Sequence, residues 1–450
     1  MPAATEYAPE RYREAGEAER SARRHAHAAA WAAYEGRFRR SFPPRPGEAD
    51  DNTAINLLKQ AVDRLCAFVA PDFPALDLDP LRESADELWL RRAWKAAGGA
   101  RLMTKFARFG ALDGHIVARV IPPAMGSPFP RLIALNPSLV TTYWRADDAE
   151  HVLWYEINYS AGGVDYRQDV VRQGEAGRWL IRDFRREAAR IPALTPGAWT
   201  LANETAWAYP LPPLVDWAHD PYPDRYYGVG EAGNLALNER VNSVASDISR
   251  ILRFHAAPRT IGIGFTAGEV TGTGIDHFWT IPARDAQVFN LEMKTDLASS
   301  MNFLNFCTRS FMAERRVIQH EGSLSEMRYV TNLGIRALYL DQLARAEELR
   351  RNYEPGIAAL SRTMLMLSGR YDGRTPLDVI LHWRDPLPVG DLEMLEALER
   401  ERAMGIISRE TAARERGRDW RMETTRMSGE SGVPVGQFGT METMSRDVGG

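Results

Sequence analysis

Three glycines, Gly228, Gly230 and Gly233, form a G-x-G-x-x-G pattern at the start of a predicted helix. In dinucleotide-binding proteins such glycines allow a pyrophosphate to sit on the helix N-terminus. Here the preceding segment PYPDRYY is not a buried parallel strand, and the acid about twenty residues on, Asp247, lies within the same helix. We therefore interpret the glycines as a flexible turn that serves as a hinge into the helix. The alternative is a soluble enzyme that binds a nucleotide at this turn.

Other residue types that could support catalysis are present but not grouped. His25 and His27 form H-x-H without an acid or thiol at metal-ligand spacing, which predicts surface histidines. The chain has no H-E-x-x-H, G-x-S-x-G or P-loop motif. The acidic stretches at 50–51, 147–148 and 391–401 are interpreted as solvated faces, because nothing in their spacing pairs them for acid–base work. We predict a protein that is not an enzyme and has no cofactor and no metal site.

Arginines gather around the second of two long predicted helices. They could meet phosphates or form ion pairs with neighbouring glutamates. The formal charge of -4 and the pI near 6.2 favour ion pairs and argue against a protein that grips nucleic acid by gross positive charge. The residues are Arg309, Arg315, Arg316 and Arg328.

Length and composition are those of an ordinary soluble protein. The 450 residues are 44% hydrophobic and 26% charged, which allows a substantial core. No apolar run is long enough for a transmembrane helix, and the charged N-terminus lacks the apolar core of a secretory signal. Cys66 and Cys307 are predicted to be buried, reduced thiols, which suits assembly in a reducing cytoplasm.

Periodicity places an α+β domain in the first half of the chain, after an N-terminal arm at 1–49. Asn52 is a predicted N-cap for a first helix, and a second helix is predicted over 85–109. The hydrophobic period then changes to two, which predicts a largely antiparallel sheet beside the two helices. The expected strands are 115–123, 130–137, 151–160, 165–173, 178–184 and 211–220.

Two long helices follow, at 231–258 and 293–318, separated by a glycine- and threonine-rich stretch at 259–292. Their apolar residues alternate at steps of four and three, the pattern of helices packed lengthwise on neighbours. Another long helix at 334–367 contains Pro355-Gly356, which should kink or break it. The seam residues that are candidates for contact between subunits are Leu237, Val241, Val244, Ile248, Ile251, Leu304 and Phe311.

The C-terminal part is predicted to be helical and then disordered. A short strand lies within 377–383, and the region 334–389 leads back toward the α+β domain. Helices are expected over 390–423, where Ser408 is a natural N-cap. The stretch 424–450, rich in Met, Ser, Gly and Thr, is predicted to be disordered.

From about residue 50 to 420 the chain resembles a portal protein of tailed bacteriophages, the head-to-tail connector. NTAINLLKQAVDRLCAFV at 52–69 and WKAAGGARLMTKFARFGALDGHIVARV at 94–120 resemble the family's opening helices and first wing strand. LIALNPSLVTTYW at 132–144 resembles its strand followed by an Asn/Asp-Pro turn.

Two further segments carry the resemblance. Residues 226–258 are similar to the family's glycine turn followed by a helix with a central asparagine, here Asn242, that ends at a proline. Residues 382–417 resemble its W-x-D-P-x-P turn and G-I-I-S-x-E-T-A segment. The chain departs from many relatives at Asn332-Leu333-Gly334, where they have Ser-Gly, and its arm and tail have no clear counterpart.

The resemblance implies a portal-type fold with named parts. An α+β wing would span 50–230, and the two long helices would form a stem. A small β-containing clip would span 259–292, a tunnel loop 319–333, and an α-helical crown 390–423. The clip residues expected to meet an adaptor or terminase are Phe265, Glu269, Thr271, His277 and Trp279. The tunnel-loop residues expected to face DNA are His320, Ser323, Ser325, Arg328, Thr331 and Asn332.

The resemblance also implies a function without bond chemistry. About twelve copies would form a homo-oligomeric ring at the capsid vertex of a virion, the conduit for DNA packaging and ejection. Implied partners are double-stranded DNA held non-specifically, the large subunit of the terminase, the head–tail adaptor, and the major capsid and scaffolding proteins, with no membrane. A portal of a prophage-derived gene-transfer particle would have the same features.

Overall fold

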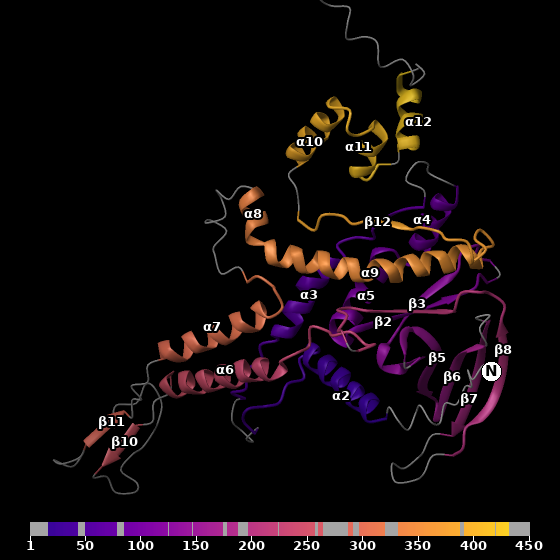
Figure 1. Cartoon of the computed structure of the whole chain (residues 1–450). Helices are drawn as coiled ribbons and strands as arrows, with labels where there is room; N and C mark the ends of the chain where they lie inside the picture. Colours follow the sequence, from indigo (N-terminus) through magenta and orange to yellow (C-terminus); the bar gives the residue numbers. More distant parts are fainter. Residues whose placement is uncertain are drawn as a thin grey trace, which may run out of the picture. The chain divides into compact units, whose positions relative to one another are not determined.

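A computed structural model describes residues 17–43, 50–78, 85–124, 126–145, 147–173, 178–187, 197–223, 225–256, 260–263, 287–290, 297–319, 332–387, 391–418 and 420–431. The chain divides into two compact units, Met1–Pro386 and Leu387–Gly450. Within the described ranges, no helix combines the length and the apolar character needed to span a bilayer. Helices and strands are mixed throughout the first unit, which agrees with the predicted α+β class (Figure 1).

The core of the first unit is built mainly from helices. α3 (Leu57–Val69) and α5 (Ala100–Asp113) pack together, and α9 (Leu340–Leu367) lies against α3. Leu58, Val62, Leu65 and Val69, at steps of three and four, are buried in α3, but its N-cap is Asn56, not Asn52. Asn56 accepts a hydrogen bond from the Lys59 backbone at 2.8 Å, whereas Asn52 bonds to the backbone of Phe42. The sequence prediction of this cap was therefore wrong by four residues.

The N-terminal helix α2 (Glu17–Tyr34) packs on α3 and α5 instead of extending into solvent. It buries His27, Ala30, Ala33 and Tyr34. The tyrosine hydroxyl donates to Asp63 at 2.6 Å. The arm is thus anchored within the chain from its first described turn.

The single helix predicted over 85–109 is two helices, α4 (Ala85–Ala97) and α5. Gly98 and Gly99 separate them, with φ values of 116° and 48° that favour glycine. The hydrophobic period runs through this break, which explains why periodicity alone did not reveal it.

Two antiparallel sheets replace the one predicted. The strand orders are β3-β2-β9 and β4-β5-β6-β7-β8, and the six predicted strands are all present within them. Two strands were not predicted: β4 follows the Asn136-Pro137 turn directly, and β8 is exposed along its length. An edge strand exposed on both faces lacks the alternation that identifies strands in a sequence. The strands are β2 (His115–Ile121), β3 (Arg131–Leu135), β4 (Val140–Arg145), β5 (Asp148–Ala161), β6 (Val164–Gln173), β7 (Arg178–Glu187), β8 (Thr200–Trp207) and β9 (Leu214–Ala218).

Two long helices, α6 (Leu235–Ala256) and α7 (Leu297–Ala313), lie side by side (Figure 1). α6 is held to the residues that lead into α3 by three polar side chains four residues apart. Asn238 bonds to the backbone of Ile55, Asn242 accepts from the Ile55 N–H at 2.8 Å, and Ser246 accepts from the Thr53 N–H at 2.9 Å. Asn242, at the centre of α6, therefore binds the extended segment that leads into α3.

The helix α9 is continuous through Pro355, so the expected break there is wrong. The interruption lies instead at Tyr339, between α8 (Asn332–Leu338) and α9. The neighbouring Gly356 is required by packing, because an added Cβ would lie 2.3 Å from the Trp217 ring. The predicted strand within 377–383 is β12 (Ile380–His382), which pairs with β1 (Ala75–Asp77).

The stretch between α6 and α7 contains one described hairpin, β10 (Thr260–Ile263) paired with β11 (Gln287–Asn290). The second unit contains α10 (Asp391–Ala403), α11 (Arg409–Glu415) and α12 (Trp420–Ser431). Ser408 caps α11 as predicted, accepting from the Thr411 N–H at 3.0 Å. α12 continues past residue 423, where we expected disorder to begin.

Candidate functional site

The G-x-G-x-x-G turn is a packing motif. An added Cβ on Gly228 would lie 2.6 Å from the Gly114 carbonyl oxygen, and one on Gly230 would lie 2.7 Å from that of Ala111. The N–H groups of Val229 and Glu231 donate to backbone carbonyls at 2.8 and 2.6 Å, so they cannot bind a phosphate. These glycines let two backbone segments approach closely, and the turn is fixed rather than flexible.

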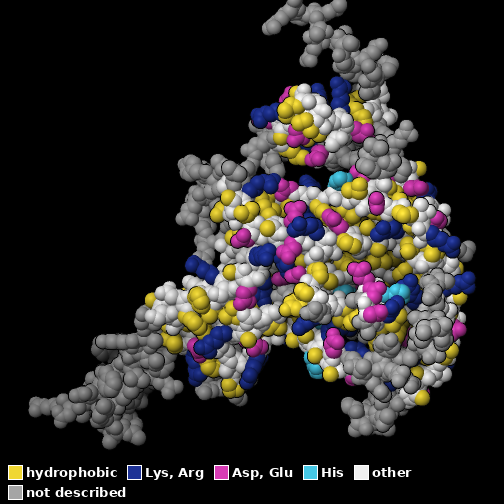
Figure 2. All heavy atoms as spheres, in the orientation of Figure 1, with side chains coloured by type: hydrophobic (Ala, Val, Ile, Leu, Met, Phe, Trp, Pro, Cys, Tyr) yellow, Lys and Arg dark blue, Asp and Glu magenta, His cyan; other side chains and the backbone are white. Residues whose placement is uncertain are grey.

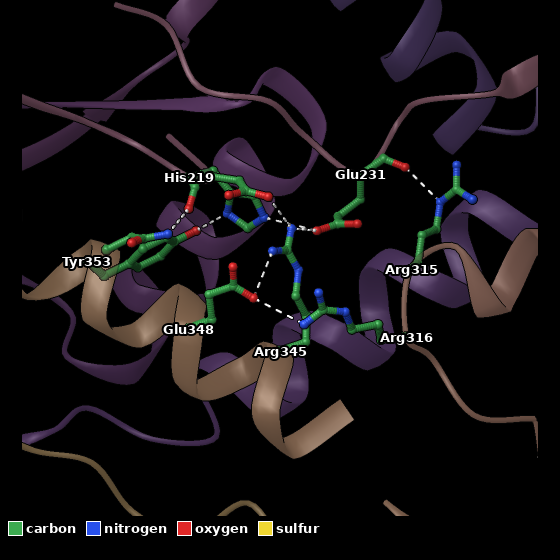
Figure 3. A network of polar contacts seen from close by, with 9 residues as sticks. His219, Glu231, Arg315, Arg316, Arg345, Glu348 and Tyr353 are labelled. Carbon is green, nitrogen blue, oxygen red and sulfur yellow. Dashed lines mark hydrogen bonds and ion pairs between the residues drawn. The ribbon is translucent and has the colours of Figure 1, made fainter. Parts of the chain in front are cut away.

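Glu231, which lies in this turn between Gly230 and Gly233, is the centre of a buried polar junction (Figure 3). Arg345 of α9 donates to Glu231 at 2.8 Å and to Asp220 at 2.7 Å. Glu348, one turn further along α9, contacts Arg345 at 3.3 Å. The junction therefore joins α9 to the end of β9 and to the start of α6.

Two further contacts extend the polar junction in opposite directions. Arg316, just after α7, pairs with Glu348 at 3.2 Å. His219 places Nδ1 2.7 Å from the Tyr353 hydroxyl and Nε2 3.5 Å from Glu231. We define the polar junction as His219, Asp220, Glu231, Arg316, Arg345, Glu348 and Tyr353.

Electrostatics keeps the junction ionised at its centre. Burial alone would raise the pKa of Glu231, but His219 and Arg345 outweigh burial and bring the pKa down to about 2. The same carboxylates raise the pKa of Arg345 above its usual range despite burial of the guanidinium. A carboxylate held this firmly in the charged form is a poor proton carrier near neutral pH. The junction is suited to positioning helices, not to acid–base chemistry.

A second buried carboxylate, Asp216 of β9, is also fully engaged. It accepts hydrogen bonds from His115 at 3.0 Å, Tyr155 at 2.9 Å and Tyr226 at 2.6 Å. Burial acts to raise its pKa, but these donors, His115 first, hold the pKa below the ordinary value. Asp216 ties the two sheets together and has no open side for a substrate.

His27 differs from its prediction as a surface histidine. It is buried, and its Nδ1 lies 3.6 Å from Asp113, which also accepts from the Trp31 indole at 3.0 Å. Burial lowers the pKa of His27 to about 4 and raises the pKa of Asp113 to about 7. His25 is exposed, as expected. In the described part of the chain, no group of three His, Cys, Asp or Glu side chains is placed to hold a metal ion.

Among the arginines near α7, the ion-pair interpretation holds clearly for Arg316. Arg316 is paired with Glu348. Arg315 is buried and donates mainly to backbone carbonyls, including that of Glu231 at 2.8 Å. Arg309 lines a hollow of about 440 Å³ at the end of α7 together with Met312, Arg316, Ile318 and Asp341. Arg328 lies outside the described residues.

The outward face of α7 exposes large apolar side chains that sequence analysis did not select. Phe303 is 43% exposed and Phe306 66%. Arg309 is the only charged residue in the α7 sequence, LASSMNFLNFCTRSFMA. Interface centres are depleted of charge and enriched in aromatic residues, which is the composition of this face. The scarcity of charged residues in α7 is the signal in the sequence that could have revealed this face. Periodicity identified instead the side of the helix that packs against the core.

The predicted stem residues lie on the inner side of the helix pair. Val241, Ile248 and Phe311 are buried within one chain, where they stabilise the subunit itself. The remaining four, Leu237, Val244, Ile251 and Leu304, are partly buried. The role of all seven in contacts between subunits stays a prediction.

Most other predicted site residues lie outside the described ranges. This holds for the clip candidates Phe265, Glu269, Thr271, His277 and Trp279. It holds also for the loop candidates His320, Ser323, Ser325, Arg328 and Thr331. Asn332 is described and is the first residue of α8. The two cysteines are buried free thiols, as predicted.

Comparison with known proteins gives a structural likeness only. No family model matches the sequence, and no curated protein matches it. The chain is similar to a chain in the neck of an empty gene transfer agent (GTA) particle, computed with C6 symmetry. That likeness has a TM-score of 0.50 at 15% identity and covers 84% of this chain and 95% of the other. A chain from the virion of a native GTA particle gives a TM-score of 0.45 at 15% identity, covering 87% and 99%.

The neck likeness shows that this chain has the fold of a structural particle component. The expected resemblance to a connector protein is thereby confirmed at the level of the fold. Both neighbours come from GTA particles.

Proposed function

We propose that this chain is the subunit of a portal-type ring at the neck of a phage-like particle, through which DNA is packaged and released. The observation that carries the proposal is the fold shared with a particle-neck component over 84% of this chain. The ring would dock the terminase large subunit and the head–tail adaptor and would contact capsid and scaffolding proteins. Both a tailed phage and a gene transfer agent particle fit this role.

The outward face of α7 supplies a surface through which copies can associate. Burying one phenylalanine side chain contributes about 1.5 to 3 kcal/mol, and a cyclic ring repeats that contribution at every interface. Phe303 and Phe306 stand three residues apart, so they share one side of the helix. The hollow lined by Arg309 and Arg316 continues this surface at the end of α7. Together they form one extended patch for a neighbouring copy.

The net charge of the chain suits a conduit that does not bind DNA tightly. Each phosphate that a protein neutralises adds salt-dependent affinity, which would hold DNA in place. The net charge of -4, repeated around a ring, avoids such affinity. The clip at 259–292, the tunnel loop at 319–333 and about twelve copies per ring remain our predictions for this assembly.

Negative-stain images and mass photometry of the purified chain test this proposal. The wild type should form rings with a central hole. Phe306→Glu should weaken association at least about tenfold, because it places a charge at an apolar contact. Leu201→Glu is a matched control, since Leu201 on β8 is 50% exposed and lies away from α7.

Two outcomes would contradict the proposal at different points. A wild-type chain that stays monomeric at every concentration would refute the ring. Rings of Phe306→Glu as stable as the wild type would leave the ring standing but refute the assignment of α7.

A further inference from the structure

Part of the five-stranded sheet is buried on both of its faces. Neighbouring residues of a strand point to opposite faces of a sheet. In three successive strands of this sheet, two adjacent side chains are both at most 7% exposed. The pairs are Trp154 and Tyr155 of β5, Val170 and Val171 of β6, and Trp179 and Leu180 of β7. Both faces of this part of the sheet are therefore covered.

One face, which we call the inner face, is covered by the smaller sheet. Tyr155, Val170 and Trp179 point to it and form one hydrophobic cluster with Val117 of β2 and Leu214 of β9. The other member of each pair points to the opposite side, which we call the outer face. The smaller sheet does not account for the burial of the outer face, because it packs on the inner one.

The outer face carries an apolar row that crosses four strands. Tyr143 of β4 lies directly opposite Trp154, Trp154 opposite Val171, and Val171 opposite Leu180. Hydrophobic and charged side chains are interspersed on the surface that Figure 2 shows, whereas the four side chains of this row are 1% to 7% exposed. A contiguous apolar row marks an interaction surface. Since these exposures are those of a single copy, the cover of the row comes from the same chain.

The start of α2 lies at one end of this row. The Arg20 guanidinium is 5.7 Å from the centre of the Tyr143 ring, and Arg23 donates to the Val140 carbonyl at 3.1 Å. Val140 and Tyr143 belong to β4, which is an edge strand of the sheet. The chain that precedes Glu17 therefore begins beside the β4 edge of the outer face.

Residues 1–16, which precede the described part of the chain, are long enough to follow the whole row. Neighbouring strands lie about 4.8 Å apart, so the row from β4 to β7 is about 14 Å long. Sixteen extended residues span up to about 50 Å. The segment contains Tyr7 and Tyr12, whose rings combine a large apolar area with a polar tip. Its length and its point of attachment therefore suit the row.

The segments that connect neighbouring strands suit the row less well. Residues 174–177 connect β6 to β7. Four residues span at most about 14 Å, and both of their ends are tied to those two strands. Residues 188–196 begin after Glu187, seven residues from Leu180 along β7, which places their start about 23 Å from the row. Residues 1–16 are thus the best-placed occupant.

We infer that residues 1–16 lie across the outer face of the five-stranded sheet of their own chain and cover the row Tyr143, Trp154, Val171 and Leu180. α2 fixes the N-terminal arm at the β4 edge, and the residues before α2 complete a layer on the sheet. The arm is then engaged within its own copy, and the outer face is closed to a neighbouring copy. This inference does not depend on the ring proposed above.

The reactivity of a thiol placed in the row tests the inference. In Val171→Cys the new thiol lies in the row, whereas Cys66 and Cys307 are buried, so the reaction with Ellman's reagent at pH 8 reports on position 171. The reaction should be slow in the full chain. In a chain that begins at Glu17 it should be at least about tenfold faster, because the row is then open to solvent.

Val170→Cys is the matched control, because Val170 is the neighbouring residue on the inner face and is 0% exposed. Its thiol should react slowly with and without residues 1–16. Equal rates for Val171→Cys in the two chains would overturn the inference. Protection that remains in the shorter chain and is lost on dilution would also overturn it, because a second copy would then cover the face.

Limited proteolysis of the unaltered full chain is a second test, and it decides the case in which the shorter chain does not fold. Trypsin should cut after Arg11 at least about tenfold more slowly than after Arg40, each rate being divided by that for a synthetic peptide of the same sequence. Arg40 follows α2 and is exposed, so it represents an open site. Equal normalised rates would overturn the inference, because residues 1–16 would then not be held against the sheet.

Discussion

Replacing Arg345 by methionine should destabilise the chain, because it removes a cation from a buried carboxylate. Glu231 is 7% exposed and is held at 2.8 Å by Arg345. Its pKa is about 2 against an ordinary value of 4.5. His219 and Arg345 hold it there together, and at 1.36 kcal/mol per unit the difference corresponds to about 3 kcal/mol for the two partners combined. In other proteins, removing one partner of a buried ion pair lowers the free energy of unfolding by about 3 to 5 kcal/mol. We expect a loss of up to about 3 kcal/mol in the free energy of unfolding at pH 7, because His219 still contacts Glu231 in the variant.

The dependence on pH distinguishes this cause from a general packing defect. A depressed carboxyl pKa contributes stability that is fully present above pH 4.5 and is lost as pH falls from 4.5 toward 2. The difference between wild type and Arg345→Met should therefore be constant from pH 7 to 5 and should shrink below pH 4.5. A packing defect would give a difference that does not depend on pH.

Urea unfolding followed by tryptophan fluorescence, at one fixed subunit concentration, measures both effects. Arg336→Met is the matched control, because Arg336 pairs with Asp385 at a position where both side chains are more than one-third exposed. An exposed pair contributes about 0 to 1 kcal/mol. A loss for Arg345→Met no larger than that of the control would refute the central role given to Arg345.

Three further predictions follow from buried contacts. Asn242→Ala should lower the free energy of unfolding by about 1 to 3 kcal/mol, measured by urea, because it leaves the N–H of Ile55 without an acceptor. Gly230→Ala should lower the melting temperature, because the added Cβ would lie 2.7 Å from a carbonyl oxygen. Gly233→Ala is the control and should lower the melting temperature far less, because Gly233 faces open space. Equal melting temperatures of the two variants would contradict the close-packing argument. Burial raises the pKa of Cys66 to about 12, so this thiol should not react with Ellman's reagent at pH 8 until the chain is unfolded in urea.

Local signals in the sequence predicted much of the secondary structure. The strands from β2 to β7, apart from β4, were predicted from a hydrophobic period of two in their sequences. Ser408 was identified as a cap because its hydroxyl can reach an N–H three residues later, a contact set by local geometry. The same reasoning misplaced the first cap, because Asn52 and Asn56 are equally suitable locally and only contacts with Phe42 and α2 distinguish them.

The functional surfaces were harder to predict, since they depend on residues far apart in the chain. The polar junction brings Glu231 against Arg345, more than a hundred residues later, and no spacing rule connects them. The seam of α7 was visible as a period, but its outward aromatic face was not selected, because periodicity identifies what is buried rather than what a partner would cover.

The sequence by itself determined the class of the chain and the absence of a recognised catalytic motif, since both depend on composition and on short-range spacing. Only the tertiary structure decided what the glycine turn does. Gly228 and Gly230 form a pattern that a nucleotide site would share, and the chain order leaves both uses open. Their close approach to Gly114 and Ala111 uses the space and the N–H groups that a phosphate would need. A contact between backbones more than a hundred residues apart is a property of the fold, so no local pattern could have revealed it.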